Sequence, residues 1–351
     1  MRTTLNSKGR TRYLSWFFLM FIAVFIVVIY YFSSIKIELG FLHEINPFWL
    51  SIAFLSQWLT YIISALIYRR LLRCFNRENL PSLADTVKAA VIALLFNQTM
   101  PSAGISGNAF FYRFFTRYQF TRHQIVSVIL IELVIFYVAV EMLMVLLLII
   151  TLFMPGSFNW IRSALVTGVG IYFILTAVVI HACGNKTFGR LYKHLSRVKI
   201  VRRLMENGLR VAGSSDNTSE AVRIGSFFRI HKTASLHALL LQLCLFITDA
   251  ATLYVLFLGL GHPINPLIPL LALVSSQIIS IVPFLPGGLI LYEGSMSFFF
   301  TQSGSPAGLA IVVTMVYRLL SFWFPIPVGM YLYRRWLRSA YKNKNGVSPV
   351  G

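Results

Sequence analysis

Two long apolar stretches of this chain are each interrupted by proline and glycine where a membrane helix would otherwise continue. The interruptions fall in residues 97–108 and 283–294. An unpaired backbone group in hydrocarbon costs several kcal/mol, so a bilayer tolerates such breaks only against protein or water. A pair of broken helices in corresponding halves of a membrane chain is typical of a transport site.

Composition places the chain among polytopic all-α membrane proteins, because 57% of its residues are hydrophobic and 12% are charged, with apolar runs of about 20 residues that recur along it. The apolar windows predict spans at 14–34, 49–68, 123–153, 161–182, 234–260 and 306–333, and broken stretches at 83–118 and 266–304.

The net charge of +20 would suggest nucleic acid in a soluble protein, but its distribution follows the positive-inside rule of membrane proteins. Only Lys36 and Arg162 lie in the predicted external loops, whereas the connection 184–232 and both terminal segments are rich in Lys and Arg. This asymmetry predicts cytoplasmic termini and no nucleic-acid partner.

The order span, span, broken stretch, span occurs twice and predicts two inverted-topology repeats, 1–155 and 156–340, followed by a disordered tail at 341–351. Each broken stretch is interpreted as a re-entrant helical hairpin, with two tilted full spans as the alternative. The hairpin tips would meet near the midplane, and rocking of one half against the other would expose the site alternately.

The second helix of each hairpin is expected to begin near Ser106 and near Leu291. The unpaired N–H groups and positive dipole ends there would attract an anion, and a lipid phosphate is the anion most available in a membrane. The alternative is that the prolines and glycines only permit kinks or close helix packing.

Ionisable residues within spans are costly and usually face a cavity or a partner. Here they are Glu132, Glu141, Asp249, Glu293 and Arg318. Glu132 is expected to meet Arg318 across the pseudo-twofold axis, either as part of the substrate site or as a structural ion pair. Glu141 lies on the opposite side of its helix, and Asp249 is expected to face protein.

These residues resemble the membrane domain of lysylphosphatidylglycerol synthases and the stand-alone flippase-like proteins related to it, over residues 10–338. A first motif, N-x-x-x-P-x-x-x-x-x-G-E, is matched by Asn97, Pro101 and Gly107, and a second, P-x-x-P-G-G-x-G-x-x-E, by Pro283, Pro286, Gly287, Gly288 and Glu293. Asn108 replaces the usual carboxylate and Ile290 a usual glycine, which puts proton coupling and tip flexibility in doubt.

The resemblance implies movement of anionic or isoprenoid-linked lipids across the cytoplasmic (inner) membrane of a prokaryote. The expected substrate-binding residues are Asn97, Pro101, Gly107, Asn108, Arg113, Glu132, Pro286, Gly287, Gly288, Glu293 and Arg318. Because the chain ends soon after its last span, synthesis of the headgroup by the same chain is not expected.

Three other expectations follow from the motifs. The chain contains no G-x-x-x-x-G-K-[ST] run and no C-x-x-C spacing, so ATP hydrolysis, bound metal and cofactors are not expected.

Two other functions remain open: a noncatalytic subunit of a lipid-modifying complex, and a disfavoured lipid-phosphate-dependent glycosyltransferase using Glu38 and Glu44. Scramblase and coupled flippase are both compatible with the sequence.

Overall fold

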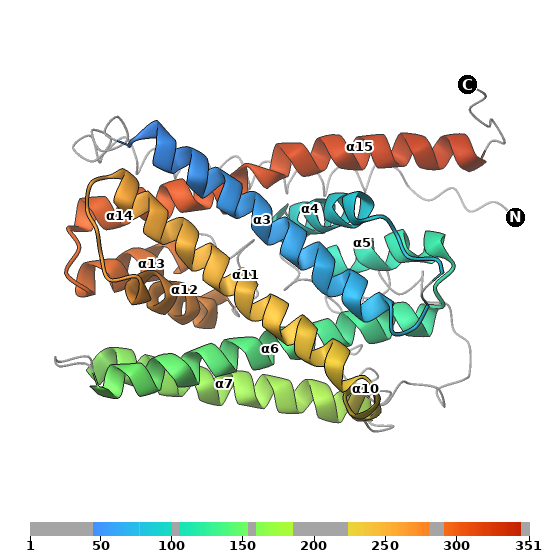
Figure 1. Cartoon of the computed structure of the whole chain (residues 1–351), viewed down its shortest axis with the longest axis horizontal. Coiled ribbons are helices and arrows are strands. Elements are labelled where there is room, and N and C mark those ends of the chain that lie inside the picture. Colours follow the sequence, from blue (N-terminus) through green and yellow to red (C-terminus); the bar gives the residue numbers. More distant parts are fainter. Residues whose placement is uncertain are drawn as a thin grey trace, which may run out of the picture. The chain divides into compact units, whose positions relative to one another are not determined.

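The computed structural model describes residues 45–76, 78–99, 105–153, 159–184, 224–280 and 291–344, and the helices in these ranges belong to one compact unit, Asn46–Gly351 (Figure 1). All regular elements in these ranges are helical. They are α3 (Pro47–Leu72), α4 (Leu83–Thr99), α5 (Ile105–Phe115), the 3₁₀ turn η1 (Thr116–Tyr118), α6 (Arg122–Phe153), α7 (Asn159–Gly184), α10 (Ile224–Ile230), α11 (Lys232–Gly259), α12 (Leu267–Ser280), α13 (Leu291–Gln302), α14 (Ala307–Arg318), the π-helical η4 (Leu319–Trp323) and α15 (Pro325–Lys344).

Five helical segments are long and apolar enough to cross a membrane: α3, α6, α7, α11 and the stretch Ala307–Ser339. They coincide with five of the predicted spans, so the polytopic all-α class is confirmed. The sixth predicted span, 14–34, lies outside the described residues. Large apolar side chains such as Phe173 and Ile174 of α7 are exposed on these helices, as a surface in contact with lipid requires.

Each broken stretch forms two short helices that pack against each other, α4 with α5 and α12 with α13. These helices contain 17, 11, 14 and 12 residues. At about 1.5 Å per residue each is shorter than the ~30 Å hydrocarbon core. The tips themselves, 100–104 and 281–290, are outside the described part of the chain, and the inverted repeat and the side from which each hairpin enters stay predictions.

Helices α3 and α11 form an antiparallel pair along their whole length (Figure 1). At one end the Asn46 amide donates to the Gly259 carbonyl at 2.9 Å, and in the middle the Thr252 hydroxyl donates to Ser56 Oγ at 2.9 Å. Both helices carry small buried residues, such as Ala53 on α3 and Ala250 on α11. Small and hydroxylated residues let membrane helices approach closely and bond across the interface, which explains the length of this contact.

The last span differs from the uninterrupted helix predicted at 306–333, since a π-helical turn, η4, separates α14 from α15 and the helix runs on to Lys344. Pro325 explains the change, because proline has no N–H for the carbonyl four residues earlier and its ring crowds that carbonyl. The Phe324 amide instead donates five residues back, to Leu319, at 2.8 Å. π-helical turns are frequent at functional sites.

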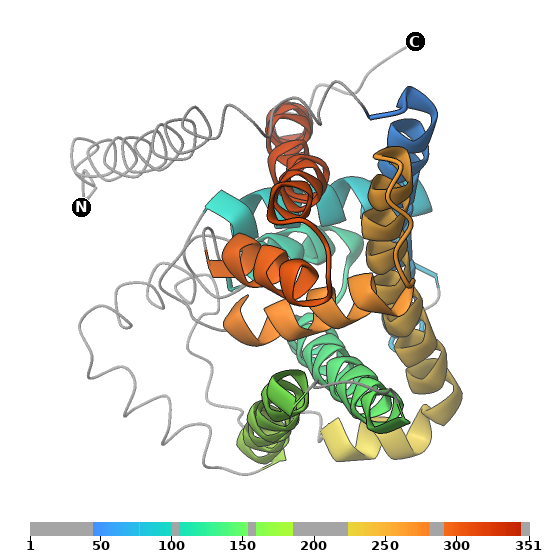
Figure 2. The same cartoon turned by 90° about the vertical axis from the view of Figure 1, so that its left-hand side faces the viewer.

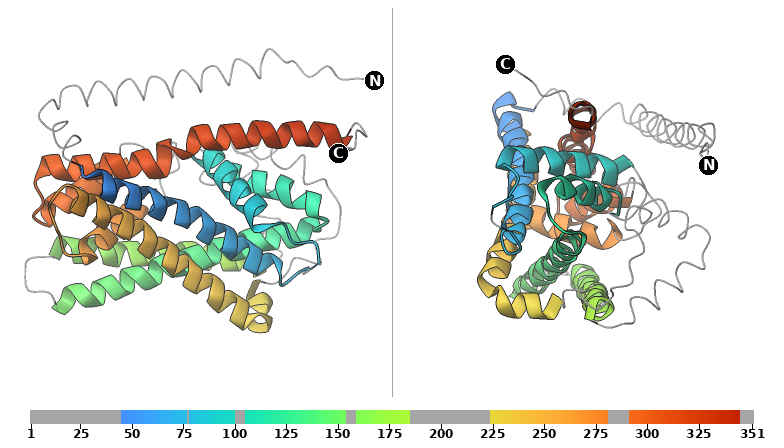
Figure 3. Two further views of the ribbon diagram at one scale, coloured as in Figure 1. Left: turned by 45° about the horizontal axis from the view of Figure 1, so that its top comes forward. Right: turned by 90° about the vertical axis from the view of Figure 1, so that its right-hand side faces the viewer.

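The last helix, α15, packs against a helix from the first half of the chain. Figure 3 shows α15 running beside α4, and a Cβ added at Gly329 of α15 would lie 2.9 Å from Leu95 Cβ of α4. The views of Figure 2 and Figure 3 also show α6 and α7 packed together. Helix α4, which precedes the first tip, is therefore supported by the last helix.

Candidate functional site: a buried ion pair beside two broken helices

Glu293 and Arg318 form an ion pair within the protein. Arg318 Nε donates to Glu293 Oε1 at 2.5 Å, and the two residues are only 6% and 8% exposed. Glu293 lies in the first turn of α13, directly after the second tip, and Arg318 is the last residue of α14. The short connection between these helices turns the chain back and brings the two residues together. Removing both charges from water is costly, so the pair depends on this mutual contact.

The guanidinium of Arg318 also lies over two aromatic rings. Its central carbon is 4.7 Å from the Tyr292 ring centroid and 4.6 Å from that of Phe322. A cation over an aromatic face is attracted by about 2 kcal/mol or more when it is desolvated. The rings hold the guanidinium plane in place, and a planar guanidinium of this kind can recognise phosphate through two parallel hydrogen bonds.

The second carboxylate oxygen of Glu293, Oε2, is buried and has no hydrogen-bond donor within the described residues. A buried acceptor without a donor costs about 1–3 kcal/mol, more when charged. Glu293 also lies at the positive end of the α13 dipole, where a bound anion was predicted from the sequence. At this tip the protein's own carboxylate takes that position, while Arg318 supplies the compensating cation.

The first broken stretch is bonded to the same turn of the last helix. Gln98, one residue from the end of α4, donates from Nε2 to the Ser321 carbonyl at 3.0 Å. Ser321 is the residue four positions before Pro325, whose missing N–H leaves this carbonyl without its usual helical donor. Residues that flank the two tips therefore contact positions 318 and 321, about 4.5 Å apart along a helix axis.

The Gln98 contact yields a stability prediction. Gln98→Leu keeps a similar volume but leaves the partly buried Ser321 carbonyl without this donor, so we expect the protein to lose about 0.5–1.5 kcal/mol of stability. Thermal unfolding of the purified protein in detergent measures this loss. Thr99→Val is the control, since the Thr99 hydroxyl donates only to the Leu95 carbonyl of its own helix; an equal loss in both variants would contradict the assigned role of Gln98.

Two motif residues of the first stretch join its helices to each other. Asn97 Oδ1 accepts from the Gly107 amide at 2.8 Å, and the Ser106 hydroxyl donates to the Phe96 carbonyl at 2.8 Å. Asn97 thus satisfies one of the amides at the start of α5 that have no partner within the helix. A Cβ on Gly107 would lie 2.5 Å from Asn97 Oδ1 and 2.6 Å from the Ala93 carbonyl oxygen. In this structure both residues serve close packing of the hairpin.

The structure corrects the predicted pairing of Glu132 with Arg318. Glu132 accepts a hydrogen bond from the Tyr68 hydroxyl at 3.2 Å, and the carboxylate beside Arg318 is that of Glu293. The wrong pair was predicted by matching positions between the two weakly similar halves of the sequence. The tight turn after α13 instead brings Glu293 to Arg318.

The other ionisable residues of the spans have separate partners. Glu141 accepts from the Thr176 hydroxyl at 3.0 Å, on the α7 side of α6. Asp249 on α11 lies 3.4 Å from Gln57 Nε2 on α3, so it faces a neighbouring helix as predicted.

The remaining predicted site residues are not brought to the Glu293–Arg318 pair by any contact in the described part of the chain. Asn108 is half-buried in the first turns of α5, and Arg113 is exposed with its guanidinium 5.4 Å from the Trp336 ring centroid of α15. Pro101 and the second-motif residues Pro283, Pro286, Gly287, Gly288 and Ile290 lie outside the described ranges.

Several residues of the site were missed from the sequence. Phe322 follows Arg318 by four residues and Tyr292 precedes Glu293, so helical spacing and adjacency could have identified both as neighbours of the pair. Gln98 and Tyr68 gave no such indication, since polar residues in spans often bond to their own helix, and only the packing of distant segments reveals their partners.

The chain is similar to one protein family over most of its length and to individual relatives over shorter segments. The family described as "Lysylphosphatidylglycerol synthase TM region" matches residues 16–329. A UPF0104 membrane protein of Pyrococcus horikoshii is 37% identical over 81 residues, which make up 23% of this chain and 24% of that protein. A UPF0104 membrane protein of Methanothermobacter thermautotrophicus is 26% identical over 99 residues, or 28% of this chain and 29% of that protein. The chain therefore matches about a quarter of the length of each relative.

Proposed function

This chain belongs to the family of the lysylphosphatidylglycerol synthase TM region, and we propose on that basis that it moves lipids across a membrane. The proposed substrate is an anionic or isoprenoid-linked lipid whose phosphate enters a site between the two broken hairpins. The proposed location is the cytoplasmic membrane of a prokaryote, and a separate lipid-modifying enzyme is a proposed partner. Translocation by this chain requires no catalytic residue.

The observation that carries the proposal is the buried Glu293–Arg318 pair beside two interrupted helices. Arginine in a membrane interior is expensive and usually marks a substrate or ion path. Here Arg318 lies at the junction of α14 with a π-helical turn. It contacts Glu293, which follows the second tip, and it is three residues from Ser321, which bonds to Gln98 of the first broken stretch. A structural ion pair alone would not need its neighbouring helices to be interrupted.

The pair has the chemistry to bind and release a phosphate. When a phosphate diester approaches, its two non-bridging oxygens, which share one negative charge, can replace the Glu293 carboxylate on the guanidinium with similar geometry. Glu293 then loses its cation, so its carboxylate has to move away from the site or find another hydrogen-bond donor. Competition between an internal carboxylate and a lipid phosphate for one arginine would keep binding reversible, as transport requires.

A lipid-flip assay tests the proposal. Liposomes that contain the purified protein and a fluorescent phosphatidylglycerol are treated with an impermeant reductant, and the rate at which inner-leaflet lipid becomes accessible is measured. We expect the wild-type protein to accelerate this rate over empty liposomes. We expect Glu293→Gln, which removes the charge but keeps the shape, to lower the protein-dependent rate about tenfold, the effect of ~1.4 kcal/mol on a barrier.

Glu141→Gln is the matched control, because Glu141 is also a carboxylate within a span but contacts Thr176 on α7. Its flip rate should equal that of the wild type. A wild-type rate equal to that of empty liposomes would contradict lipid movement and leave the role of a noncatalytic subunit. Equal effects of Glu293→Gln and Glu141→Gln would contradict the location of the site.

A further inference from the structure

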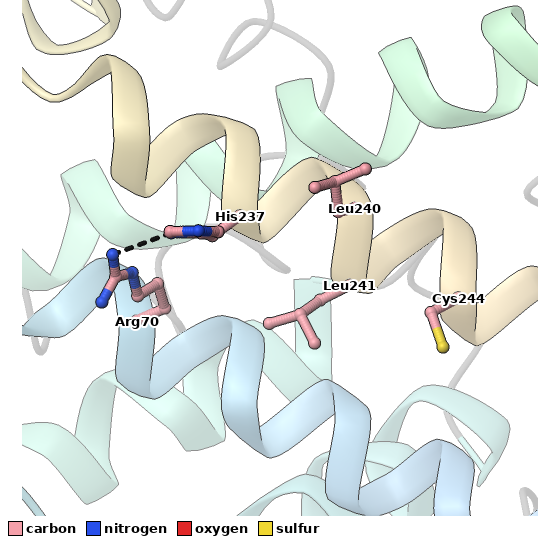
Figure 4. A pocket seen from close by; sticks show the side chains of 5 residues that line it. All are labelled: Arg70, His237, Leu240, Leu241 and Cys244. Carbon is pink, nitrogen blue, oxygen red and sulfur yellow. Dashed lines mark hydrogen bonds between the residues drawn. The ribbon is translucent and has the colours of Figure 1, made fainter.

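A shallow groove of about 470 Å³ runs over the α3–α11 pair, away from the buried ion pair. Its lining side chains are Arg70, His237, Leu240, Leu241 and Cys244 (Figure 4). The groove is polar at one end and apolar along the rest, and none of the described residues that line it carries a carboxylate. We infer that it holds one anionic phospholipid of the surrounding membrane, with the phosphate at Arg70 and His237 and an acyl chain along Leu240, Leu241 and Cys244.

The polar end is built to donate hydrogen bonds. Arg70 Nη2 lies 2.8 Å from His237 Nδ1. A guanidinium can only donate, so Nδ1 accepts, and the imidazole proton resides on Nε2. The site therefore presents a fixed positive charge and an imidazole N–H side by side. That combination suits a phosphate diester, which offers one negative charge and several acceptor oxygens.

The apolar end extends along the helix axis away from these donors. His237 and Cys244 are seven residues apart on α11, or about 10.5 Å at 1.5 Å per residue. Arg70 lies in the last turn of α3 and His237 in the second turn of the antiparallel α11, so the donors are at one end of the pair and the apolar residues lie toward its middle. A phospholipid has the same polarity along its length, with its phosphate at the membrane interface and its chains below.

Both helices continue the apolar surface beyond the groove. On α3, exposed apolar residues precede Arg70 at intervals of three or four: Leu55, Leu59, Ile62 and Leu66. On α11, exposed residues follow His237 at the same intervals: Leu240, Cys244 and Ile247. Each surface is thus an exposed apolar stripe with one polar residue at the same end, which matches a lipid better than a soluble anion.

Cys244 gives a direct probe of occupancy, because its side chain is exposed in the groove. In a Cys74→Ser, Cys183→Ser background it is the only thiol of the chain. The rate of its alkylation by a small maleimide is measured in detergent with added phosphatidylglycerol, diacylglycerol or inorganic phosphate. We expect phosphatidylglycerol at about ten times its Kd to slow alkylation roughly tenfold, because the thiol reacts only when the groove is empty, and the other two additives to leave the rate unchanged.

Variants of the polar end complete the test. Arg70→Gln and His237→Leu should each restore fast alkylation in the presence of phosphatidylglycerol. Arg73→Gln should not, since Arg73 is exposed at the same end of α3 but does not line the groove. Equal protection by diacylglycerol or by inorganic phosphate, or protection that persists in a folded His237→Leu protein, would overturn the inference. These outcomes do not depend on the flip assay, because a resident lipid need not be a transported one.

Discussion

Replacing Arg318 with alanine is expected to destabilise the protein by about 3–5 kcal/mol, the effect of breaking a buried ion pair by removing one partner. Glu293 would remain as a buried carboxylate, 6% exposed, with neither oxygen bonded within the described part of the chain. The rings of Tyr292 and Phe322 would also lose the cation that lies over them. Thermal unfolding in detergent, followed by size-exclusion chromatography of the heated sample, measures the loss.

The double variant Glu293→Leu, Arg318→Met separates stability from function. Replacement of a buried ion pair by apolar residues of similar volume is often neutral or stabilising, so the double variant should unfold near the wild-type temperature. If the pair binds the lipid phosphate, this stable variant should still fail to flip lipid. A stable double variant with wild-type flipping would show that the pair has only a structural role.

Gly107→Ala is expected to have the second largest effect on stability. The added Cβ would lie 2.6 Å from the Ala93 carbonyl oxygen and 2.5 Å from Asn97 Oδ1. Relief requires α5 to move away from α4, which would break the bond between Asn97 and the Gly107 amide. We expect a loss of about 1–3 kcal/mol, as for other insertions into a well-packed contact, measured by thermal unfolding.

Gly170→Ala is the matched control for this substitution. Gly170 is also within a helix, α7, but a Cβ there meets no atom of the described residues within 4 Å. Alanine should leave stability unchanged or raise it by up to about 1 kcal/mol, since glycine is unfavourable within helices. A Gly107→Ala protein as stable as Gly170→Ala would mean that the hairpin helices are not held as closely as the structure places them.

The sequence predicted the fold class and most of the helices correctly because apolar length and proline–glycine breaks act locally. Spans such as 123–153 and 161–182 appear as α6 and α7 within a few residues. The broken stretches appear as pairs of short helices for the same reason, because proline and glycine in a helix interior weaken it.

The site was predicted in part. Glu293 and Arg318 were both identified, because ionisable residues are rare in spans, but they were not predicted to pair with each other. Their contact depends on the turn between α13 and α14, and the bonds of Gln98 and Tyr68 depend on the packing of segments far apart in sequence. Pro325 indicates that the Ser321 carbonyl needs a donor, yet nothing local indicates which residue supplies it.

The close contact of α3 with α11 restricts how such a protein can change shape. One helix comes from the first predicted repeat and the other from the second, and they are joined by hydrogen bonds at Asn46–Gly259 and Ser56–Thr252. If the two halves swung apart as rigid blocks, both bonds would break, and the buried Thr252 hydroxyl would lose its partner on the other helix. The α3–α11 pair is therefore expected to stay together as a rigid element during a conformational change, while the short helices around it move.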